Sequence, residues 1–287
     1  GGSFTLDNGV GETFDRPAVI ISNHQSHLEL MCLLMLTPKI VVITNEWAWR
    51  NPIYGALIRR AEYVPAAEGI ENYMPQLRSL VERGYSILVF PEGTRSEDSR
   101  IQRFHKGAFH LAETMGLDLL PVCLHGVGHV LPKRELMLRP GRITVTVGRR
   151  VSPDDTSFGA ASRERTRAFN RFYREWYAEL SCKLEDAAYW MPLVKHQYRY
   201  KGVEAQRLCR RTFREMDRWR EVVESISKEN EYYVMSETGQ GERALLTALL
   251  HPEIRIKAVM NNPELYDVAR NNPAVPSNLT FELMENG

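Results

Sequence analysis

Residues 17–30, "PAVIISNHQSHLEL", place an apolar run directly before a polar loop and the start of an apolar helix. The run over 17–22 is rich in Val and Ile and bounded by Pro and Asn, as buried strands usually are. Further runs of this kind predict strands over 39–44, 61–65, 85–90, 117–126 and 142–148. Helical patterns that end at glycine lie between several of them, over 69–84 and 107–116. This alternation predicts an α/β fold with a mostly parallel sheet flanked by helices.

The second half of the chain has a different pattern. The stretch "VSPDDTSFG" (151–159) interrupts the alternation, and two long helices separated by residues 195–202 are predicted over roughly 160–227. A second strand–helix–strand pattern follows over 231–271. We therefore expect a first domain over 1–190 and a second over 191–287, the latter a helical linker followed by a partial Rossmann-like βαβ unit.

Composition limits the possible functions. The chain has 287 residues, 43% of them hydrophobic, and a formal net charge of +1, so it can bury a core and lacks the cationic surplus of nucleic-acid binders. Its four cysteines have no paired spacing, which indicates neither a disulfide framework nor a zinc site. The longest charge-free apolar run near the start of the chain, residues 30–38, is too short to span a bilayer. A lipid-related function would therefore place the protein at the membrane surface.

A second polar loop follows the predicted strand over 85–90. The stretch "LVFPEGTRS" (88–96) breaks at Pro91 into Glu92, Gly93, Thr94, Arg95 and Ser96. The carboxyl ends of strands are where α/β sheets bind ligands. Gly93 permits close backbone approach, and the planar fork of Arg95 suits phosphate or carboxylate. A plain surface turn is the alternative interpretation, but it does not require this combination of residues.

Together, "NHQSHLE" (23–29) and "FPEGTRS" (90–96) resemble the signature of the glycerolipid (lysophospholipid) acyltransferase family. That signature is Asn-His, four residues and Asp, followed by Phe-Pro-Glu-Gly-Thr-Arg. The resemblance covers about residues 10–155, including "FHKGAF" (104–109) and "LLPVCLHG" (119–126). It implies the family's α/β fold and transfer of an acyl group from an acyl-CoA or acyl-carrier-protein thioester to a lysolipid hydroxyl. It also implies an active site that faces a membrane.

The residue types fit this chemistry. A hydroxyl has a pKa far above 7, so its attack on a thioester requires a general base, and neutral histidine is suitable. We expect His24 to lie in the loop after the strand and Glu29 to lie in the first turn of the following helix. From there Glu29 accepts the imidazole N–H and fixes the tautomer, as the carboxylate of serine hydrolases does.

Glu29 has a second interpretation and departs from the family. Ser26 and Glu29 fit a capping box that closes a helix amino terminus, and both roles place Glu29 in the first turn. Glu29 also stands where the family usually has Asp. One extra methylene displaces a carboxylate by about 1 Å, and errors of that size cost about 10²-fold in rate.

A metal site is the other alternative for these histidines. His24 and His27 are three residues apart, and His125 and His129 are four apart, but no His-Glu-x-x-His pattern exists. We expect no metal and interpret His27 as a polar neighbour on the helix.

The acceptor region departs further from the family. Asn45 stands at the usual Lys position, and "VPAA" (64–67) offers Ala where Arg is common. Arg59 and Arg60 are candidate substitutes, and Asn23 and Lys106 complete the predicted substrate-binding set. The acceptor is therefore either a lysophosphatidate or a lysolipid without the usual phosphate, such as an acylated amino-acid lipid. The stretch "WAW" (47–49) is either core or membrane contact.

Residues 231–262 resemble the opening of class I S-adenosylmethionine-dependent methyltransferases. Glu237 stands at the first glycine position of the Gly-x-Gly-x-Gly loop, Gly239 and Gly241 remain, and Asn261 or Asn262 replaces the expected acid. An added negative charge and a missing acceptor disfavour cofactor binding. We interpret 191–287 as a degenerate, truncated and inactive methyltransferase-like fragment.

The sequence thus predicts a lysolipid O-acyltransferase with His24 and Glu29 as catalytic residues. Acyl-CoA or acyl-carrier protein is expected as co-substrate, with no further cofactor. The expected partners are a lysolipid and a membrane surface, with no nucleic acid, and the expected location is the cytoplasmic face of a membrane, in a longer multidomain chain. The alternatives are a lipid-binding pseudoenzyme or scaffold and, less favoured, a methyltransferase.

Overall fold

The computed structural model describes residues 2–44, 62–65, 70–215, 223–227 and 229–284. Its contacts divide the chain into two compact units. The first is made of residues 2–138 and 142–180, and the second mainly of residues 181–287. Whether 1–190 and 191–287 are separate functional domains stays a prediction.

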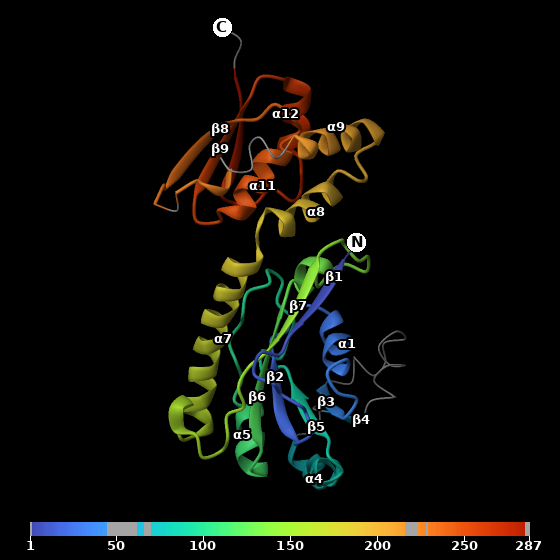
Figure 1. Ribbon diagram of the computed structural model, residues 1–287, viewed down its shortest axis with the longest axis vertical. Helices are drawn as coiled ribbons and strands as arrows, with labels where there is room; N and C mark the ends of the chain where they lie inside the picture. Colours follow the sequence, from blue (N-terminus) through green and yellow to red (C-terminus); the bar gives the residue numbers. More distant parts are fainter. Residues whose placement is uncertain (1, 45–61, 66–69, 216–222, 228, 285–287) are drawn as a thin grey trace. The chain divides into compact units, whose positions relative to one another are not determined.

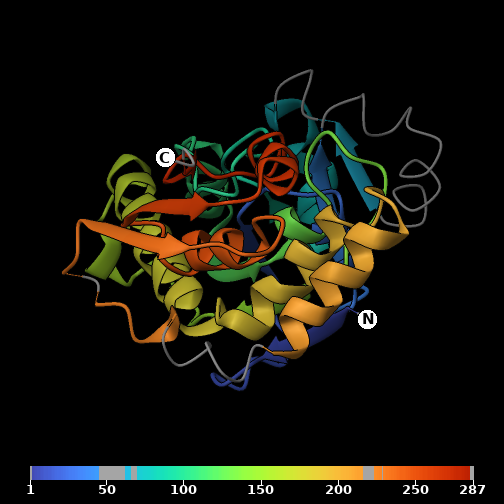
Figure 2. The ribbon, with the colours of Figure 1, turned by 90° about the horizontal axis from the view of Figure 1, so that it is seen from above.

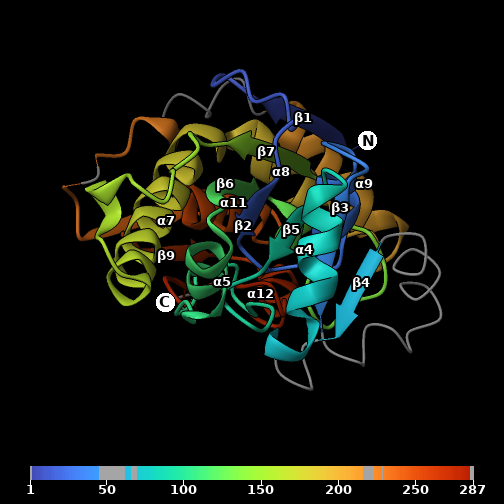
Figure 3. The same cartoon turned by 90° about the horizontal axis from the view of Figure 1, so that it is seen from below.

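The first unit is built on a seven-stranded sheet with the order β1-β7-β6-β2-β5-β3-β4. The order can be followed from β1 and β7 at one edge to β4 at the other (Figure 3). Neighbouring strands are parallel except for β7, which runs antiparallel to β6 and parallel to β1. The strands are β1 (Ser3–Asp7), β2 (Ala18–Ser22), β3 (Ile40–Thr44), β4 (Glu62–Pro65), β5 (Ser86–Val89), β6 (Asp118–His125) and β7 (Arg142–Val147).

Helices connect these strands and cover the sheet. They are α1 (Leu28–Leu34), the 3₁₀ turn η1 (Ile70–Tyr73) with α4 (Met74–Glu82), α5 (Gly107–Met115), α6 (Val127–Val130), the turn η2 (Thr156–Phe158) and α7 (Ser162–Leu184). Figure 1 shows α1 on one side of the sheet and α5 and α7 on the other. The predicted α/β fold with a mostly parallel sheet is confirmed, and the six predicted strands lie within one residue of their expected limits.

The apolar pattern explains why the sheet forms at the centre. All five residues of β2 are buried, and β6 is buried from its second residue onward. Leu28 and Leu33 of α1 pack with Ile20 and Leu88 on one face. At about 25 cal/mol per Å² of buried apolar surface, such central strands supply much of the driving force for folding.

Tyr173 joins α7 to the middle of the sheet. Its buried hydroxyl donates to the carbonyl of Ile21 at 2.6 Å and accepts from the N–H of Val122 at 3.1 Å. The ring meets Phe104 edge-on, with centroids 5.2 Å apart. The tyrosine therefore fixes the helix against the carboxyl-terminal half of β2.

The helical region after 160 differs from the prediction of two long helices. The first helix ends at Leu184, and α8 (Ala187–Gln197) and α9 (Val203–Arg214) follow it. The break has a local cause: the Asp186 side chain accepts the backbone N–H of Tyr189 at 2.7 Å and caps α8. The region is thus made of three helices over the described part of 160–215.

The second unit has a three-stranded parallel sheet with the order β10-β9-β8. Its elements after α9 are β8 (Tyr232–Ser236), α11 (Glu242–Leu250), β9 (Arg255–Met260), α12 (Pro263–Arg270) and β10 (Leu279–Leu283). Figure 2 shows its strands in orange to red beside the helices of the same unit. The predicted strand–helix–strand pattern over 231–271 is present.

Candidate active site

The carboxyl end of β2 carries the predicted catalytic pair. His24 follows the strand in the loop, and Glu29 lies in the first turn of α1, as the sequence predicts. Nδ1 of His24 lies 2.6 Å from Oε2 of Glu29. The carboxylate is fully buried, whereas the imidazole keeps 23% of its side-chain surface exposed. The acid is therefore shielded, and the histidine remains open on one side.

The loop between the two residues wraps around the carboxylate. Oε1 of Glu29 accepts the backbone N–H groups of Gln25 and, at 2.8 Å, of Ser26. This is half of the predicted capping box. The other half differs, because the Ser26 hydroxyl accepts from Leu28 at 3.2 Å and donates to the carbonyl of Leu131 at 2.8 Å. Glu29 thus closes the helix start and contacts His24 at the same time.

These contacts determine which imidazole nitrogen is basic. An ionised carboxylate only accepts hydrogen bonds, so Nδ1 of His24 donates its proton to Glu29 and Nε2 keeps its lone pair. Phe90 stacks on the imidazole ring of His24, with a centroid distance of 4.3 Å and an interplanar angle of 19°, and so restrains the orientation of that ring. The arrangement prepares Nε2 to take a proton.

The loop after β5 fixes the backbone of His24. Oε1 of Glu92 accepts the N–H of His24 at 2.7 Å, and the carbonyl of His24 accepts the N–H of Ser96 at 2.7 Å. Oε2 of Glu92 accepts the N–H of Gln102 at 2.8 Å. Burial raises the pKa of Glu92 to about 7. The two sequence motifs are therefore joined by hydrogen bonds to the backbone of His24 at the carboxyl edge of the sheet.

The tip of this loop is open to solvent. Gly93 and Thr94 are exposed, and Gly93 has a φ of +71°. A Cβ atom at Gly93 would lie 3.4 Å from the His105 ring, so the loop is closely apposed to that ring. Arg95 donates from Nη1 to the carbonyl of Lys133 at 3.2 Å. The N–H of Gly93 donates to the carbonyl of Phe90 at 3.1 Å, so the exposed Thr94 carries the side chain that this tip offers to a ligand.

Arg95 also influences the neighbouring histidine. Burial lowers the pKa of His27 to about 4, and the positive charge of Arg95 contributes to the same shift. His27 is therefore neutral near pH 7, which agrees with its interpretation as a polar neighbour on the helix.

Other members of the predicted set are placed differently. Asn23 is fully buried, and its amide donates to and accepts from the backbone of Leu124, both at 2.8 Å. Ser96 is buried and donates to Asp98 at 2.9 Å. Lys106 lines a groove beside α7. Arg59, Arg60, Asn45 and residues 47–49, 66 and 67 lie outside the described residues. The binding roles of all of them stay predictions.

Three residues of the site were not predicted. Phe90 stacks on His24, Gln102 binds Glu92, and the amide of Gln25 donates to the carbonyl of Ser99 at 2.7 Å. Phe90 was detectable in principle, since it stands last in a strand directly before the motif. The pairing of Gln102 with Glu92 depends on the path of an irregular loop, which no periodicity reveals.

Within the described ranges, no three His, Cys, Asp or Glu side chains come together in a way that would hold a metal ion. In the same part of the chain, the helices are all too short or too polar to cross a bilayer.

In the loop after β8, two carboxylates accept hydrogen bonds from nearby backbone N–H groups. Glu237 is buried, which raises its pKa, and it accepts the N–H groups of Gly239 at 2.7 Å and Ala244 at 2.9 Å. Glu242 is also buried and accepts the N–H of Gln240 at 2.6 Å. Asn262 caps α12 by accepting from Leu265 at 3.1 Å. The N–H groups of Gly239, Gln240 and Ala244 are therefore already occupied by Glu237 and Glu242.

Residues 8–125 match the model of the Acyltransferase family. This segment contains both motifs, so the match supports the acyltransferase resemblance predicted for this part of the chain. Curated relatives of the segment are 1-acyl-sn-glycerol-3-phosphate acyltransferases. One from Chlamydomonas reinhardtii is 33% identical over 149 residues, which is 49% of this chain and 44% of the relative. A chloroplastic one from Arabidopsis thaliana is 34% identical over 138 residues, covering 46% and 39%. The matched part thus spans less than half the length of either relative.

A solved structure shows the same fold. The crystal structure of PlsC, the 1-acyl-sn-glycerophosphate acyltransferase of Thermotoga maritima, aligns with a TM-score of 0.53 and 23% identity. The alignment covers 62% of this chain and 72% of that one. The likeness supports the α/β architecture of the first unit.

Proposed function

We propose that this protein is a lysolipid O-acyltransferase in which His24 is the general base and Glu29 orients it. The observation that carries the proposal is the 2.6 Å contact between Nδ1 of His24 and Oε2 of Glu29 beside the loop of the second motif. The names of the curated relatives support the same reaction class. The acyl donor is an acyl-CoA or acyl-carrier-protein thioester.

The reaction follows from the free nitrogen of His24. Nε2 takes the proton of the lysolipid hydroxyl as its oxygen attacks the thioester carbonyl carbon. The tetrahedral intermediate then expels the thiolate, which receives the proton from the imidazolium. One C–O bond forms, one C–S bond breaks, and His24 returns to its neutral form. Glu29 stabilises the imidazolium between the two proton transfers.

The exposed loop tip supplies the groups that bind the reacting carbonyl and the acceptor. The oxyanion requires N–H donors or positive charge, and Thr94 and Arg95 stand at the correct edge of the sheet, beside Gly93, whose own N–H donates to Phe90. Glu92 does not face the substrate in this scheme. Its role is to hold the backbone of His24 in place.

The test measures thiol release from acyl-CoA, and from acyl-carrier protein, with a panel of lysolipids that includes lysophosphatidate and an acylated amino-acid lipid. His24→Ala should lower transfer by at least about 10²–10⁴-fold. His27→Ala is the matched control, because it removes a neighbouring imidazole and should leave most activity. Unchanged turnover by His24→Ala overturns the proposal, and lipid binding without transfer by the wild type favours the pseudoenzyme or scaffold.

The panel also determines the acceptor, and a vesicle-binding assay tests the proposed peripheral membrane association. The methyltransferase alternative gains no support from the second unit, since Glu237 and Glu242 occupy the N–H groups of Gly239, Gln240 and Ala244. Calorimetric titration with S-adenosylmethionine checks this interpretation.

A further inference from the structure

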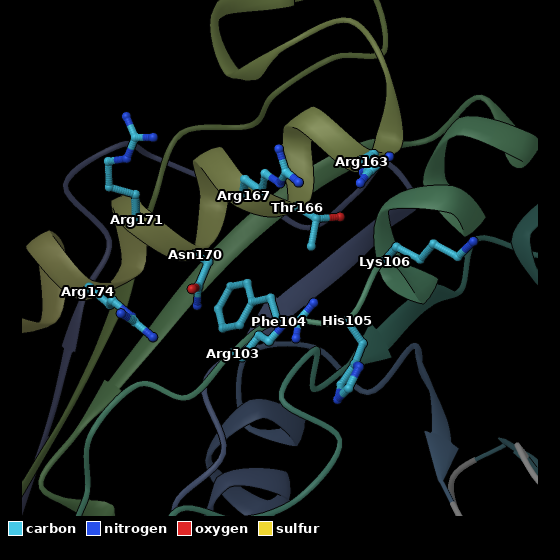
Figure 4. Close-up of a pocket in the computed structure, with 10 residues that line it drawn as sticks. All are labelled: Arg103, Phe104, His105, Lys106, Arg163, Thr166, Arg167, Asn170, Arg171 and Arg174. Carbon is cyan, nitrogen blue, oxygen red and sulfur yellow. The ribbon is translucent and has the colours of Figure 1, made fainter.

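A groove of about 790 Å³ lies in the first unit beside α7. Figure 4 shows its two walls, one from α7 and one from residues 103–106 before α5. Its lining contains five arginines, one lysine and one histidine, and no acidic side chain. The lining residues are Arg103, Phe104, His105, Lys106, Arg163, Thr166, Arg167, Asn170, Arg171 and Arg174. The groove is therefore strongly cationic.

The α7 wall carries a row of arginines. Arg163, Arg167, Arg171 and Arg174 recur at helical spacing and are exposed. At 1.5 Å per residue they extend over about 16 Å. Within the described part of the chain, no carboxylate forms an ion pair with any of them. Arg165 on the same helix is the contrast, because it is buried and donates to the carbonyls of Pro153, Gly159 and Asp155.

The second wall adds positive potential. Arg103 and Lys106 are exposed, and Lys106 is the N-cap of α5. The first turn of α5 has no acidic residue, and no side chain caps it. The partial positive charge of its amino end therefore adds to that of the side chains. Cations on two facing walls repel one another unless an anion lies between them.

The groove adjoins the candidate active site. The Asn170 amide donates to the carbonyl of Gln102 at 2.7 Å, and the N–H of Gln102 donates to Glu92. Glu92 in turn accepts the N–H of His24. His105 lines the groove and lies against Gly93. A ligand in the groove is thus adjacent to the loop that holds His24.

We propose that the groove binds the phosphate groups of a ligand that carries several of them. Resting on the proposed function, we assign this ligand to the thioester donor, whose carrier is then coenzyme A. The number and spread of the arginines exceed what one phosphate satisfies, and guanidinium groups suit phosphate geometry. The volume lies within the range of small-molecule sites, about 300–1,000 Å³. A concave site with two cationic walls fits a small phosphorylated ligand better than a flat membrane or a protein surface.

The experiment titrates the full chain with coenzyme A, with coenzyme A lacking its 3′-phosphate, with glycerol 3-phosphate and with acyl-carrier protein, by calorimetry without lysolipid. Arg103→Gln/Arg167→Gln removes one cation from each wall. Arg78→Gln/Lys183→Gln removes the same charge at exposed positions outside the groove. The groove variant should weaken coenzyme A binding about tenfold or more, and loss of the 3′-phosphate should weaken binding to the wild type. The control variant should bind as the wild type does.

Three results overturn the proposal: equal affinity of both variants for coenzyme A, groove-dependent binding of glycerol 3-phosphate alone, or groove-dependent binding of acyl-carrier protein alone. A different result would contradict the proposed function alone. If coenzyme A binding depends on the groove but no donor acylates any lysolipid, the groove assignment stands and the acyltransferase activity does not.

Discussion

Oε2 of Glu29 lies 2.6 Å from Nδ1 of His24, while Oε1 of the same carboxylate accepts the N–H of Ser26 at 2.8 Å. The longer side chain therefore spans two partners at once. The Glu29 carboxylate thus reaches Nδ1 of His24 despite its extra methylene, because the loop and α1 are arranged around the glutamate.

Glu29→Asp should impair the protein, although Asp is the usual residue in the family that the motif resembles. A side chain shortened by one methylene loses either His24 or the N–H groups of Gln25 and Ser26. We expect kcat to fall by about 10²-fold. Initial rates of thiol release with a saturating acceptor measure this, and a rate equal to or above that of the wild type would contradict the geometry.

Glu29→Gln is the companion change, because it keeps the length and an acceptor for Ser26. Its amide N–H₂ faces Nδ1 of His24 and favours the tautomer in which Nε2 carries the proton. We expect a loss of about 10²–10⁴-fold in kcat with a nearly unchanged KM. A variant that loses substrate affinity alone would assign Glu29 to binding.

The buried carboxyl group of Glu92 should make stability depend on pH. Its folded pKa of about 7 exceeds its ordinary value of 4.5, so the folded state holds a proton that the unfolded state loses between these values. The free energy of unfolding should therefore fall as pH rises from about 4.5 to 7, by about 3 kcal/mol, and then level off. Denaturant unfolding of the wild type and Glu92→Gln across this window measures it, and a constant difference between the two proteins would refute the shift.

Tyr173→Phe should destabilise the first unit without altering its apolar packing. The change leaves the carbonyl of Ile21 and the N–H of Val122 without the tyrosine hydroxyl. We expect a loss of about 1–3 kcal/mol in the free energy of unfolding. Phe172→Leu on the same helix is a packing control. A loss below about 0.5 kcal/mol for Tyr173→Phe would show that water replaces the hydroxyl.

Arg150→Ala should lower the free energy of unfolding by more than Tyr173→Phe does. Its guanidinium contacts both oxygens of Glu12, at 2.6 and 2.9 Å, and Asp118 at 3.3 Å, and the Arg150 and Glu12 side chains are only 13% and 9% exposed. The pKa of Glu12 is lowered by this hydrogen bonding. Removing the arginine leaves the nearly buried Glu12 carboxylate without its ion-pair partner, whereas Asp118 keeps Arg16 at 3.3 Å, and the loss should be about 3–5 kcal/mol. Arg150→Lys keeps the charge but not the fork, so thermal unfolding should place it between alanine and wild type.

The central strands and the contact between His24 and Glu29 were predictable, because both depend on local patterns. β2, β5 and β6 are apolar runs with clear ends, and His24 and Glu29 are separated by one short loop. The antiparallel direction of β7 and its pairing with β1 were not predictable, since they depend on contacts between residues far apart in sequence. The end of α7 at Leu184 was missed because the cap at Asp186 is a single side chain inside a continuous helical pattern.

The cationic groove was missed for a related reason. Its two walls are separated by more than fifty residues, and the helical arginines alone resemble a solvated face. These arginines line a groove only because Phe104 and Asn170 bring the loop of residues 103–106 against α7.

The pairing of β1 with β7 also sets the smallest piece of this chain that is suitable for expression. The family match ends at residue 125, but β7 covers the outer edge of β6, and β1 covers that of β7. A protein cut at the limits of the match would present the apolar edge of β6 to other molecules, and such edges are templates for aggregation. Cloning limits at residues 2 and 180 avoid this, since they retain both covering strands and the α7 turn that carries Tyr173.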